Sequence, residues 1–198
     1  MNLVRVDDMS RVDDLVERNF GVADGVLTIG GRPVTEIAAE HGTPLFVYDA
    51  TLVDRALDDL RAALPAVIDL HYSVKANPFP AVVRHLVGRG CGLEVASAGE
   101  MALALAAGCS PERIIFAGPG KTVAEIEMAL DNGIGELHVE SPTELRRVAA
   151  AAAERGTVAS IALRVNPAGE AQGGAMRMGG RPSPFGIDEE LLDEVVAV

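Results

Sequence analysis

One lysine stands where a predicted strand gives way to a turn, and its amine is well placed for covalent chemistry. Residues 68–74 alternate and are rich in β-forming residues, which predicts a strand, and Ala76-Asn77-Pro78 follows as a turn. Strand–helix folds place their ligands at the carboxyl ends of the strands, where a primary amine can form a Schiff base with a carbonyl compound. Lys75 is therefore a candidate nucleophile. The alternative is a surface lysine at a strand end, and position alone does not separate the two.

Three other side chains near predicted strand ends are candidates to act with this amine. Glu94 and Arg164 each lie in or beside a short apolar run. His138 is placed in the same way, and an imidazole can exchange protons near neutral pH or stack on an aromatic ring. A position in the core or at the mouth of the sheet is the alternative for His138.

The elements that must position these residues repeat along the chain. From Lys75 onward a strand and a helix alternate about every 20 to 25 residues, which predicts parallel strands joined by right-handed crossovers. Three helices begin with an S/T-x-x-E capping box, at Ser97, Thr122 and Ser141. The predicted strands are residues 68–74, 92–95, 114–116, 137–139 and 160–165.

Around Lys75, residues 72–77 read Tyr-Ser-Val-Lys-Ala-Asn. This segment resembles the lysine motif of the fold type III pyridoxal-phosphate decarboxylases, which include the diaminopimelate, ornithine and arginine decarboxylases. In that family the lysine closes the first strand of a TIM barrel and holds the cofactor covalently. The resemblance implies pyridoxal 5'-phosphate as the cofactor and Lys75 as the catalytic and cofactor-binding residue.

Two more segments resemble motifs of this family. Residues 92–100 resemble its second motif, with Glu94 where aspartate is usual, and in the family that acid lies beside the cofactor and the lysine. Residues 163–167 resemble its fifth-strand arginine motif, which implies that Arg164 lies in the cofactor site. Because an arginine at the end of an apolar strand is costly unless it meets an acid, we expect Arg164 to pair with Glu94 across the barrel. His138 is a further cofactor-binding candidate, although the family's stacking histidine comes from a later strand.

Three further features are given smaller roles. Residues 116–121 resemble the family's segment after its third strand, and their glycines lack the spacing of a Walker phosphate loop, so we expect Lys121 at the barrel rim. We expect Glu100 to act mainly in the capping box of Ser97. Residues 185–186 resemble a Phe-Gly pair that follows the family's fifth strand.

The repeat and the resemblance together predict an α/β fold, a partial TIM (β/α)8 barrel of the alanine-racemase and decarboxylase type. Residues 44–198 would form the first part of this pyridoxal-phosphate-binding barrel. Residues 1–43 would be an N-terminal lead-in whose strand, within residues 25–31, belongs to a C-terminal β-domain. A complete barrel takes roughly 250 residues, so we expect the 198-residue chain to be the N-terminal part of a longer protein.

The remaining segments also carry expectations. Residues 4–20 read as a short helix or a partly ordered lead-in, residues 34–41 as a helix and residues 45–48 as a strand. Asp49 or Thr51 is expected to cap the helix that follows.

Residues 166–184 interrupt the rhythm with a glycine-rich stretch longer than most structureless loops. Within it, Arg177 and Arg181 are candidate contacts for the phosphate of a carrier-protein arm, or else two solvated charges. Asp188 is expected to cap a final helix.

Composition limits the possible partners. A net charge of −12 argues against nucleic-acid binding, which depends on basic surfaces. The sequence has no apolar run of membrane-spanning length and no signal-peptide pattern near its first residues. Cys91 and Cys109 have neither metal-ligand spacing nor the pattern of a disulfide framework. We expect a cytoplasmic protein that does not bind nucleic acid or membranes.

The predicted activity is pyridoxal-phosphate-dependent decarboxylation of an L-amino acid. The resemblance implies a homodimer with a shared active site, and a substrate that is either a free diamino acid of the diaminopimelate type or a glutamyl group tethered to an acyl carrier protein. The chain alone is expected to be inactive. The alternatives are an amino-acid racemase and a non-catalytic cofactor-binding barrel.

Overall fold

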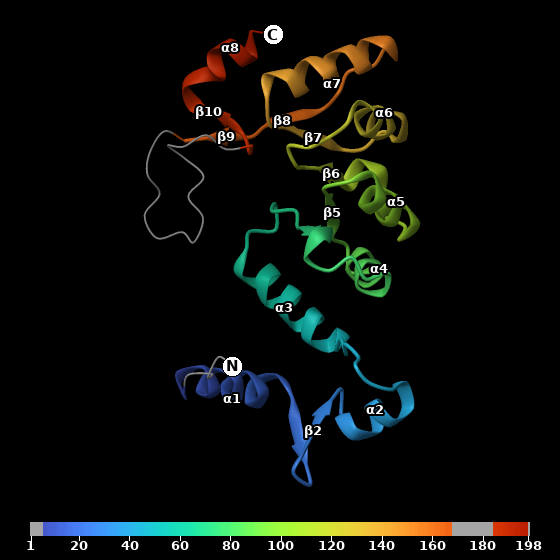
Figure 1. Cartoon of the computed structure of the whole chain (residues 1–198), viewed down its shortest axis with the longest axis vertical. Coiled ribbons are helices and arrows are strands. Elements are labelled where there is room, and N and C mark those ends of the chain that lie inside the picture. The colour runs from blue at the N-terminus through green and yellow to red at the C-terminus, as the bar shows by residue number, and fades with distance from the viewer. Residues whose placement is uncertain (1–5, 168–183, 198) are drawn as a thin grey trace. The chain divides into compact units, whose positions relative to one another are not determined.

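The computed structural model describes residues 6–167 and 184–197 (Figure 1). The chain divides into two compact units, residues 1–68 and 69–198. None of the helices in the described ranges combines the length and the apolar character needed to cross a membrane.

The first unit combines three helices with a small antiparallel sheet. Asp24 and Gly25 both adopt positive φ, which allows the tight turn between the first two strands. The strands pair in chain order, β1 (Gly21–Ala23), β2 (Val26–Ile29) and β3 (Arg32–Pro33). The helices are α1 (Val6–Asn19), α2 (Val34–His41) and α3 (Ala50–Ala63). The strand expected within residues 25–31 and the helix expected over 34–41 are therefore confirmed.

One prediction for this unit is wrong. Residues 45–48 form no strand, and no strand of the described chain pairs with them. Extended backbone becomes a strand when a neighbour satisfies its N–H and C=O groups, and local β propensity does not supply that neighbour.

The start of α3 is as expected, because the Asp49 carboxylate accepts a hydrogen bond from the backbone N–H of Thr51 at 2.9 Å.

The second unit contains a five-stranded parallel sheet in which the strands lie in the order of the chain. Each strand follows a helix, and from the second onward each strand pairs with the strand before it in the sheet. The strands are β4 (His71–Ser73), β5 (Gly92–Val95), β6 (Ile114–Phe116), β7 (Glu136–Val139) and β8 (Ile161–Leu163). All five predicted strands are present. The first and the last are shorter than expected: residues 68–70 lie outside β4 and Val74 belongs to the 3-10 turn η1 (Val74–Ala76), while β8 ends at Leu163.

Four helices of this unit lie on one side of the sheet (Figure 1). They are α4 (Pro80–Gly88), α5 (Ala98–Ala106), α6 (Val123–Asn132) and α7 (Pro142–Glu154), with the 3-10 turn η2 (Pro111–Arg113) before β6. Parallel strands in sequential order with helices on one face are the arrangement of a β/α barrel, whereas a doubly wound sheet carries helices on both faces. Within the described residues the sheet is open, because β4 and β8 each pair with one strand of it.

The two faces of the sheet differ in chemistry. Leu93, Val95, Leu137 and Val139 are buried in the core beneath the helices. Because side chains alternate along a strand, the residues between them face the opposite side, where a barrel has its interior. Glu94 and His138 belong to this second set, as do Glu136 and Ala162 through their pairing positions. The alternation thus brings polar groups from separate strands to one face.

The helix starts confirm the capping prediction and add to it. The hydroxyl of Thr122 and the carboxylate of Glu125 form a complete capping box at α6. At α5 and α7 the serine accepts from the N–H three residues on, as expected. The matching glutamates reach one residue further back, since Glu100 accepts from the N–H of Ala96 and Glu144 from that of Glu140. These two acids therefore tie a helix start to the end of the preceding strand. Glu100 has a structural role, as expected, but its carboxylate accepts from Ala96 and not from Ser97 as a capping box requires.

The last described segment forms a separate two-stranded sheet with the residues that follow β8. β9 (Val165–Asn166) pairs in parallel with β10 (Ile187–Asp188), and the chain continues into η3 (Glu189–Leu191) and α8 (Leu192–Val196). Asp188 precedes η3, but its side chain makes no capping hydrogen bond, so that prediction is wrong. Most of the glycine-rich stretch, with Arg177 and Arg181, lies outside the described residues.

Candidate functional site

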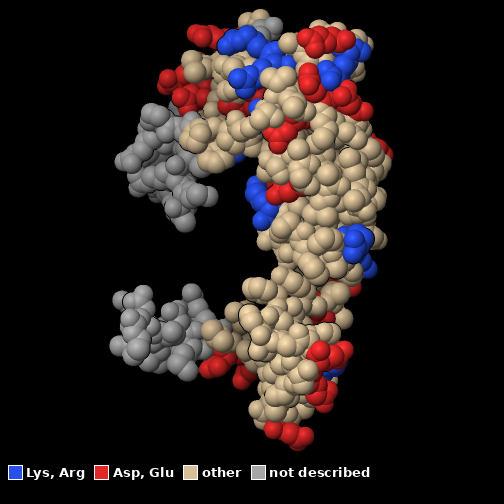
Figure 2. All heavy atoms as spheres, turned by 45° about the vertical axis from the view of Figure 1, so that its right-hand side comes forward, with Lys and Arg blue, Asp and Glu red and all other residues tan. Residues whose placement is uncertain are grey.

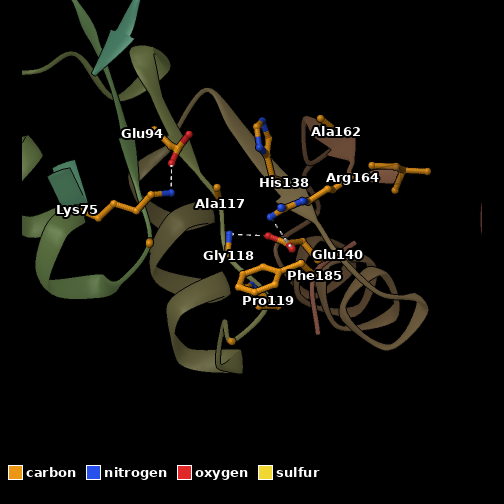
Figure 3. A pocket seen from close by; sticks show the side chains of 13 residues that line it. Lys75, Glu94, Ala117, Gly118, Pro119, His138, Glu140, Ala162, Arg164 and Phe185 are labelled. Carbon is orange, nitrogen blue, oxygen red and sulfur yellow. Dashed lines mark hydrogen bonds and ion pairs between the residues drawn. The ribbon is translucent and has the colours of Figure 1, made fainter. Parts of the chain in front are cut away.

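A cavity of about 610 Å³ lies at the carboxyl ends of the parallel strands. It is lined by the four predicted site residues, Lys75, Glu94, His138 and Arg164, and by Glu140 and Phe185 among others (Figure 3). The structure therefore brings together side chains that are far apart in the sequence and that come from five different segments.

Lys75 reaches the cavity from the turn after β4. Its Nζ lies 2.9 Å from Oε1 of Glu94 on the neighbouring strand β5, and the same oxygen accepts a hydrogen bond from the Ser73 hydroxyl at 3.1 Å. The Lys75 side chain is 63% exposed, whereas that of Glu94 is 29% exposed. The amine is thus held by an acid and remains accessible from the cavity.

The Lys75 contact controls the ionisation of Glu94. Partial burial alone would raise the pKa of the Glu94 carboxyl, but the hydrogen bond and charge of Lys75, together with the Ser73 hydroxyl, outweigh it and hold that pKa below its ordinary value. Glu94 is therefore an anion at neutral pH, and the ion pair with Lys75 is intact.

Arg164 does line the cavity, but its expected partner is wrong. Its Nη1 lies 3.1 Å from Oε2 of Glu140, and its guanidinium lies over the Phe185 ring at 5.0 Å. Glu94 is engaged by Lys75 from the adjacent strand, whereas Glu140 follows β7, the strand next to β8. Adjacency of strand ends, and not the distance across the barrel, decides this pairing.

His138 lies at the cavity with its ring held by a second acid. Its Nε2 is 2.8 Å from Oε1 of Glu136, two residues earlier on the same strand, and its side chain is 30% exposed. This places His138 at the mouth of the sheet. Its expected contact with the cofactor stays a prediction.

Glu140 is the site residue that sequence reasoning missed. Its side chain is 1% exposed. The backbone N–H groups of Gly118 and Gly186 donate to its carboxylate at 2.8 and 3.2 Å, in addition to Arg164. Gly118 has φ +106°, a conformation that favours glycine, and this directs its N–H toward the acid. The available signal was an acid between the last apolar residue of β7 and Ser141, the cap of α7.

Lys121 is not the open rim residue that was expected. Its side chain is 1% exposed, and its Nζ donates to the backbone oxygens of Gly118 and His138 and to Glu144, at 2.7, 2.6 and 2.8 Å. The sequence contains two lysines, Lys75 and Lys121. Since Lys121 is buried with its three hydrogens used, Lys75 is the side-chain amine of this chain that a ligand can reach.

The residues present fit a carbonyl-bearing, anionic cofactor. An accessible amine, a paired arginine and an imidazole surround a cavity whose volume lies within the range of small-molecule sites. In the described part of the chain no group of three histidine, cysteine or acidic side chains is arranged to hold a metal ion.

Comparisons with known proteins agree with this chemistry. Residues 50–197 match the family described as "Pyridoxal-dependent decarboxylase, pyridoxal binding domain". The chain is 39% identical over 155 residues to a diaminopimelate decarboxylase of Zymomonas mobilis, covering 75% of this chain and 36% of that protein. It is 38% identical over 163 residues to the L-glutamyl-[BtrI acyl-carrier protein] decarboxylase of Niallia circulans, covering 82% of this chain and 38% of that protein.

Solved structures are similar over nearly the same part. AQ1208 from Aquifex aeolicus superposes with a TM-score of 0.80 at 35% identity, covering 94% of this chain and 43% of that one. Diaminopimelate decarboxylase from Helicobacter pylori, complexed with L-lysine, gives a TM-score of 0.75 at 33% identity, covering 82% and 42%. The chain thus spans about two fifths of the length of these relatives. The parallel strands correspond to part of the TIM-barrel domain of such decarboxylases. The chain belongs to the pyridoxal-dependent decarboxylase family, whose cofactor is pyridoxal phosphate.

Proposed function

We propose that the protein carrying this chain decarboxylates an L-amino acid with pyridoxal phosphate, and that Lys75 is its cofactor-binding lysine. The observation that carries the proposal is the position of this amine: it is accessible at the cavity, paired with Glu94, while the other lysine is buried and fully hydrogen-bonded. The family assignment supports the same reaction class.

Each residue at the cavity then has a definite task. Lys75 holds the cofactor through its amine, and Glu94, at 2.9 Å, orients that amine and balances its charge while it is protonated. Arg164 presents a guanidinium to an anionic oxygen of the cofactor or substrate, and His138 presents an imidazole at the mouth of the sheet. When bound, pyridoxal phosphate takes up the electron pair that departing carbon dioxide leaves behind.

The substrate class follows from the relatives. Several of them are named diaminopimelate decarboxylases, which supports a free diamino acid as the substrate. The similarity to the carrier-protein glutamyl decarboxylase, which covers 82% of this chain, supports a carrier-tethered amino acid as the second candidate.

We place the protein in the cytoplasm as a homodimer with a shared active site. Cys91 and Cys109 are buried and the sequence shows no disulfide framework, which suits a reducing compartment. We assign residues 1–43 to a lead-in that contributes β2 to a separate β-domain, and residues 44–198 to the barrel. The antiparallel β1–β3 sheet lies within residues 1–43 and is distinct from the parallel sheet, which supports a lead-in separate from the barrel.

Borohydride reduction tests the cofactor site. The intact protein that carries this chain is incubated with pyridoxal phosphate, reduced and digested, and the modified peptide is identified by mass spectrometry. We expect the cofactor on the Lys75 peptide, no modification of Lys121, and loss of the adduct in Lys75→Ala. An unmodified wild-type protein, or the same adduct in Lys75→Ala, would show that the assignment is wrong.

Product analysis tests the reaction. We expect carbon dioxide from meso-diaminopimelate, or from a glutamyl group on a carrier protein if the second substrate is correct. Inversion of the amino acid's configuration without release of carbon dioxide would identify a racemase. If neither carbon dioxide nor the inverted amino acid is formed, the protein is a non-catalytic cofactor-binding protein.

A further inference from the structure

Glu140 is the most deeply buried acid at the cavity. Its side chain is 1% exposed, yet it carries the negative charge that faces Arg164. A buried carboxylate is costly unless hydrogen bonds and an opposite charge compensate it. Here both are supplied, by the N–H groups of Gly118 and Gly186 and by the Arg164 guanidinium.

These three donors come from different segments of the cavity wall. Gly118 follows β6, Arg164 follows β8, and Gly186 lies beside β10. In Figure 3 the Glu140 carboxylate lies between Gly118 and Arg164, on the far side of the cavity from the Lys75–Glu94 pair. One carboxylate thus joins the loops that surround the guanidinium.

A second buried ion pair supports Glu140 from its backbone side. The N–H of Glu140 donates to Oε2 of Glu144 at 2.8 Å, and the other oxygen of Glu144 accepts from Lys121. Lys121 also donates to the carbonyl oxygen of Gly118, the residue whose N–H binds Glu140. Both the backbone and the carboxylate of Glu140 are therefore held in place.

We propose that Glu140 is a positioning residue that acts on cofactor binding through Arg164. It holds Nη1 of Arg164 against the cavity wall, so that the rest of the guanidinium is oriented toward an anionic oxygen in the cavity. The Phe185 ring also restrains the guanidinium, whose Cζ lies over the ring at 5.0 Å from its centroid. This inference rests on the proposed function, because it assumes that pyridoxal phosphate occupies the cavity.

A double-mutant cycle on the intact protein separates this role from a merely structural one. The dissociation constant for pyridoxal phosphate is measured by titration of its absorption band in wild type, Glu140→Gln, Arg164→Gln and the double variant. Glutamine keeps the size of the side chain and removes its charge. We expect Glu140→Gln to weaken binding about tenfold when Arg164 is present, and less than about twofold in Arg164→Gln, as for residues that act in contact.

The matched control is Glu136→Gln, which changes the acid that contacts His138 on the same strand. Its effect on the dissociation constant is expected to be the same with and without Arg164, because distant side chains act additively. If Glu140→Gln does not fold, as judged by urea unfolding, the cycle is run with Glu140→Asp, which keeps the charge and shortens the reach. We expect Glu140→Asp to weaken binding of pyridoxal phosphate more when Arg164 is present than in Arg164→Gln, with a smaller difference than for Glu140→Gln.

The outcomes are distinct. An equal loss of affinity from Glu140→Gln in both Arg164 backgrounds, or no loss in either, overturns the inference while a borohydride adduct on Lys75 leaves the proposed function standing. Wild-type protein without an adduct on Lys75 overturns both.

Discussion

At the level of single residues, the charge of Glu94 depends on what surrounds it. Burial would raise the pKa of its carboxyl, and the hydrogen bond and charge of Lys75 lower it by more, with help from Ser73. The lowered pKa of Glu94 therefore depends mainly on Lys75. Removal of Lys75 should raise the pKa of the Glu94 carboxyl.

We expect Lys75→Met to raise the pKa of Glu94, because burial is then opposed only by the Ser73 hydroxyl and the charge of His138. Carbon-13 NMR titration of the glutamate carboxyls in the intact protein measures this. The control is Glu125, whose pKa is lowered by the backbone N–H groups of Thr122 and Ala98 and which should titrate unchanged. An unchanged Glu94 midpoint in Lys75→Met would contradict the assignment of its shift to Lys75.

The same shift has a consequence for stability. Since the folded state lowers the pKa of Glu94, the Lys75–Glu94 pair stabilises the fold above the ordinary carboxyl pKa, and this contribution is lost as the pH falls through the lowered value. The pH dependence of unfolding should therefore flatten on the acid side in Lys75→Met.

At the level of elements, buried charges fasten the strand ends to the helix that follows. Lys121 and Glu144 are 1% and 5% exposed and are joined at 2.8 Å. Through Gly118 and His138, Lys121 also holds the backbone after β6 and within β7. Loops lining a cavity need such support, because loop backbone has few ladder hydrogen bonds of its own.

We expect Lys121→Met to lower the free energy of unfolding by about 3–5 kcal/mol, because it leaves Glu144 buried without its charge partner. Urea unfolding of the intact protein measures this. The control is Arg147→Met, which removes an exposed cation from α7, the helix that carries Glu144, and should change stability by less than about 0.5 kcal/mol. Equal losses of unfolding free energy in Lys121→Met and Arg147→Met would show that the buried Lys121–Glu144 pair does not stabilise the fold more than an exposed cation does.

At the level of the whole molecule, the described strands form an open parallel sheet whose cavity carries the candidate cofactor groups. Basic and acidic side chains are both spread over the visible surface in Figure 2, and the chain carries a net charge of −12. Recognition of an anionic cofactor must then depend on local cations such as Arg164, because the overall field repels anions.

We expect pyridoxal phosphate to stabilise the intact protein, by about 2.7 kcal/mol when its free concentration is one hundred times the dissociation constant. Differential scanning calorimetry with and without cofactor measures the rise in melting temperature. Arg147→Met should show the full rise. Lys75→Ala should show a much smaller one at the same cofactor concentration, because the covalent attachment is lost, and a wild-type rise in Lys75→Ala would count against Lys75 as the attachment site.

The sequence by itself determined the features that local chemistry controls. Short apolar runs define β5 to β8, the capping residues define the starts of α5, α6 and α7, and the residues around Lys75 identify the family. Each of these depends on neighbours within a few positions along the chain, so it can be read without a structure.

Only the tertiary structure decided which distant groups meet. Arg164 pairs with Glu140 and not with Glu94, Lys121 is buried, and residues 45–48 belong to no strand of the described chain. The physical reason is that ion pairs and strand pairing depend on which strand ends are adjacent and on how well each charge is compensated there. No local pattern specifies these, because the partners are separated by tens of residues and become neighbours only when the strands assemble.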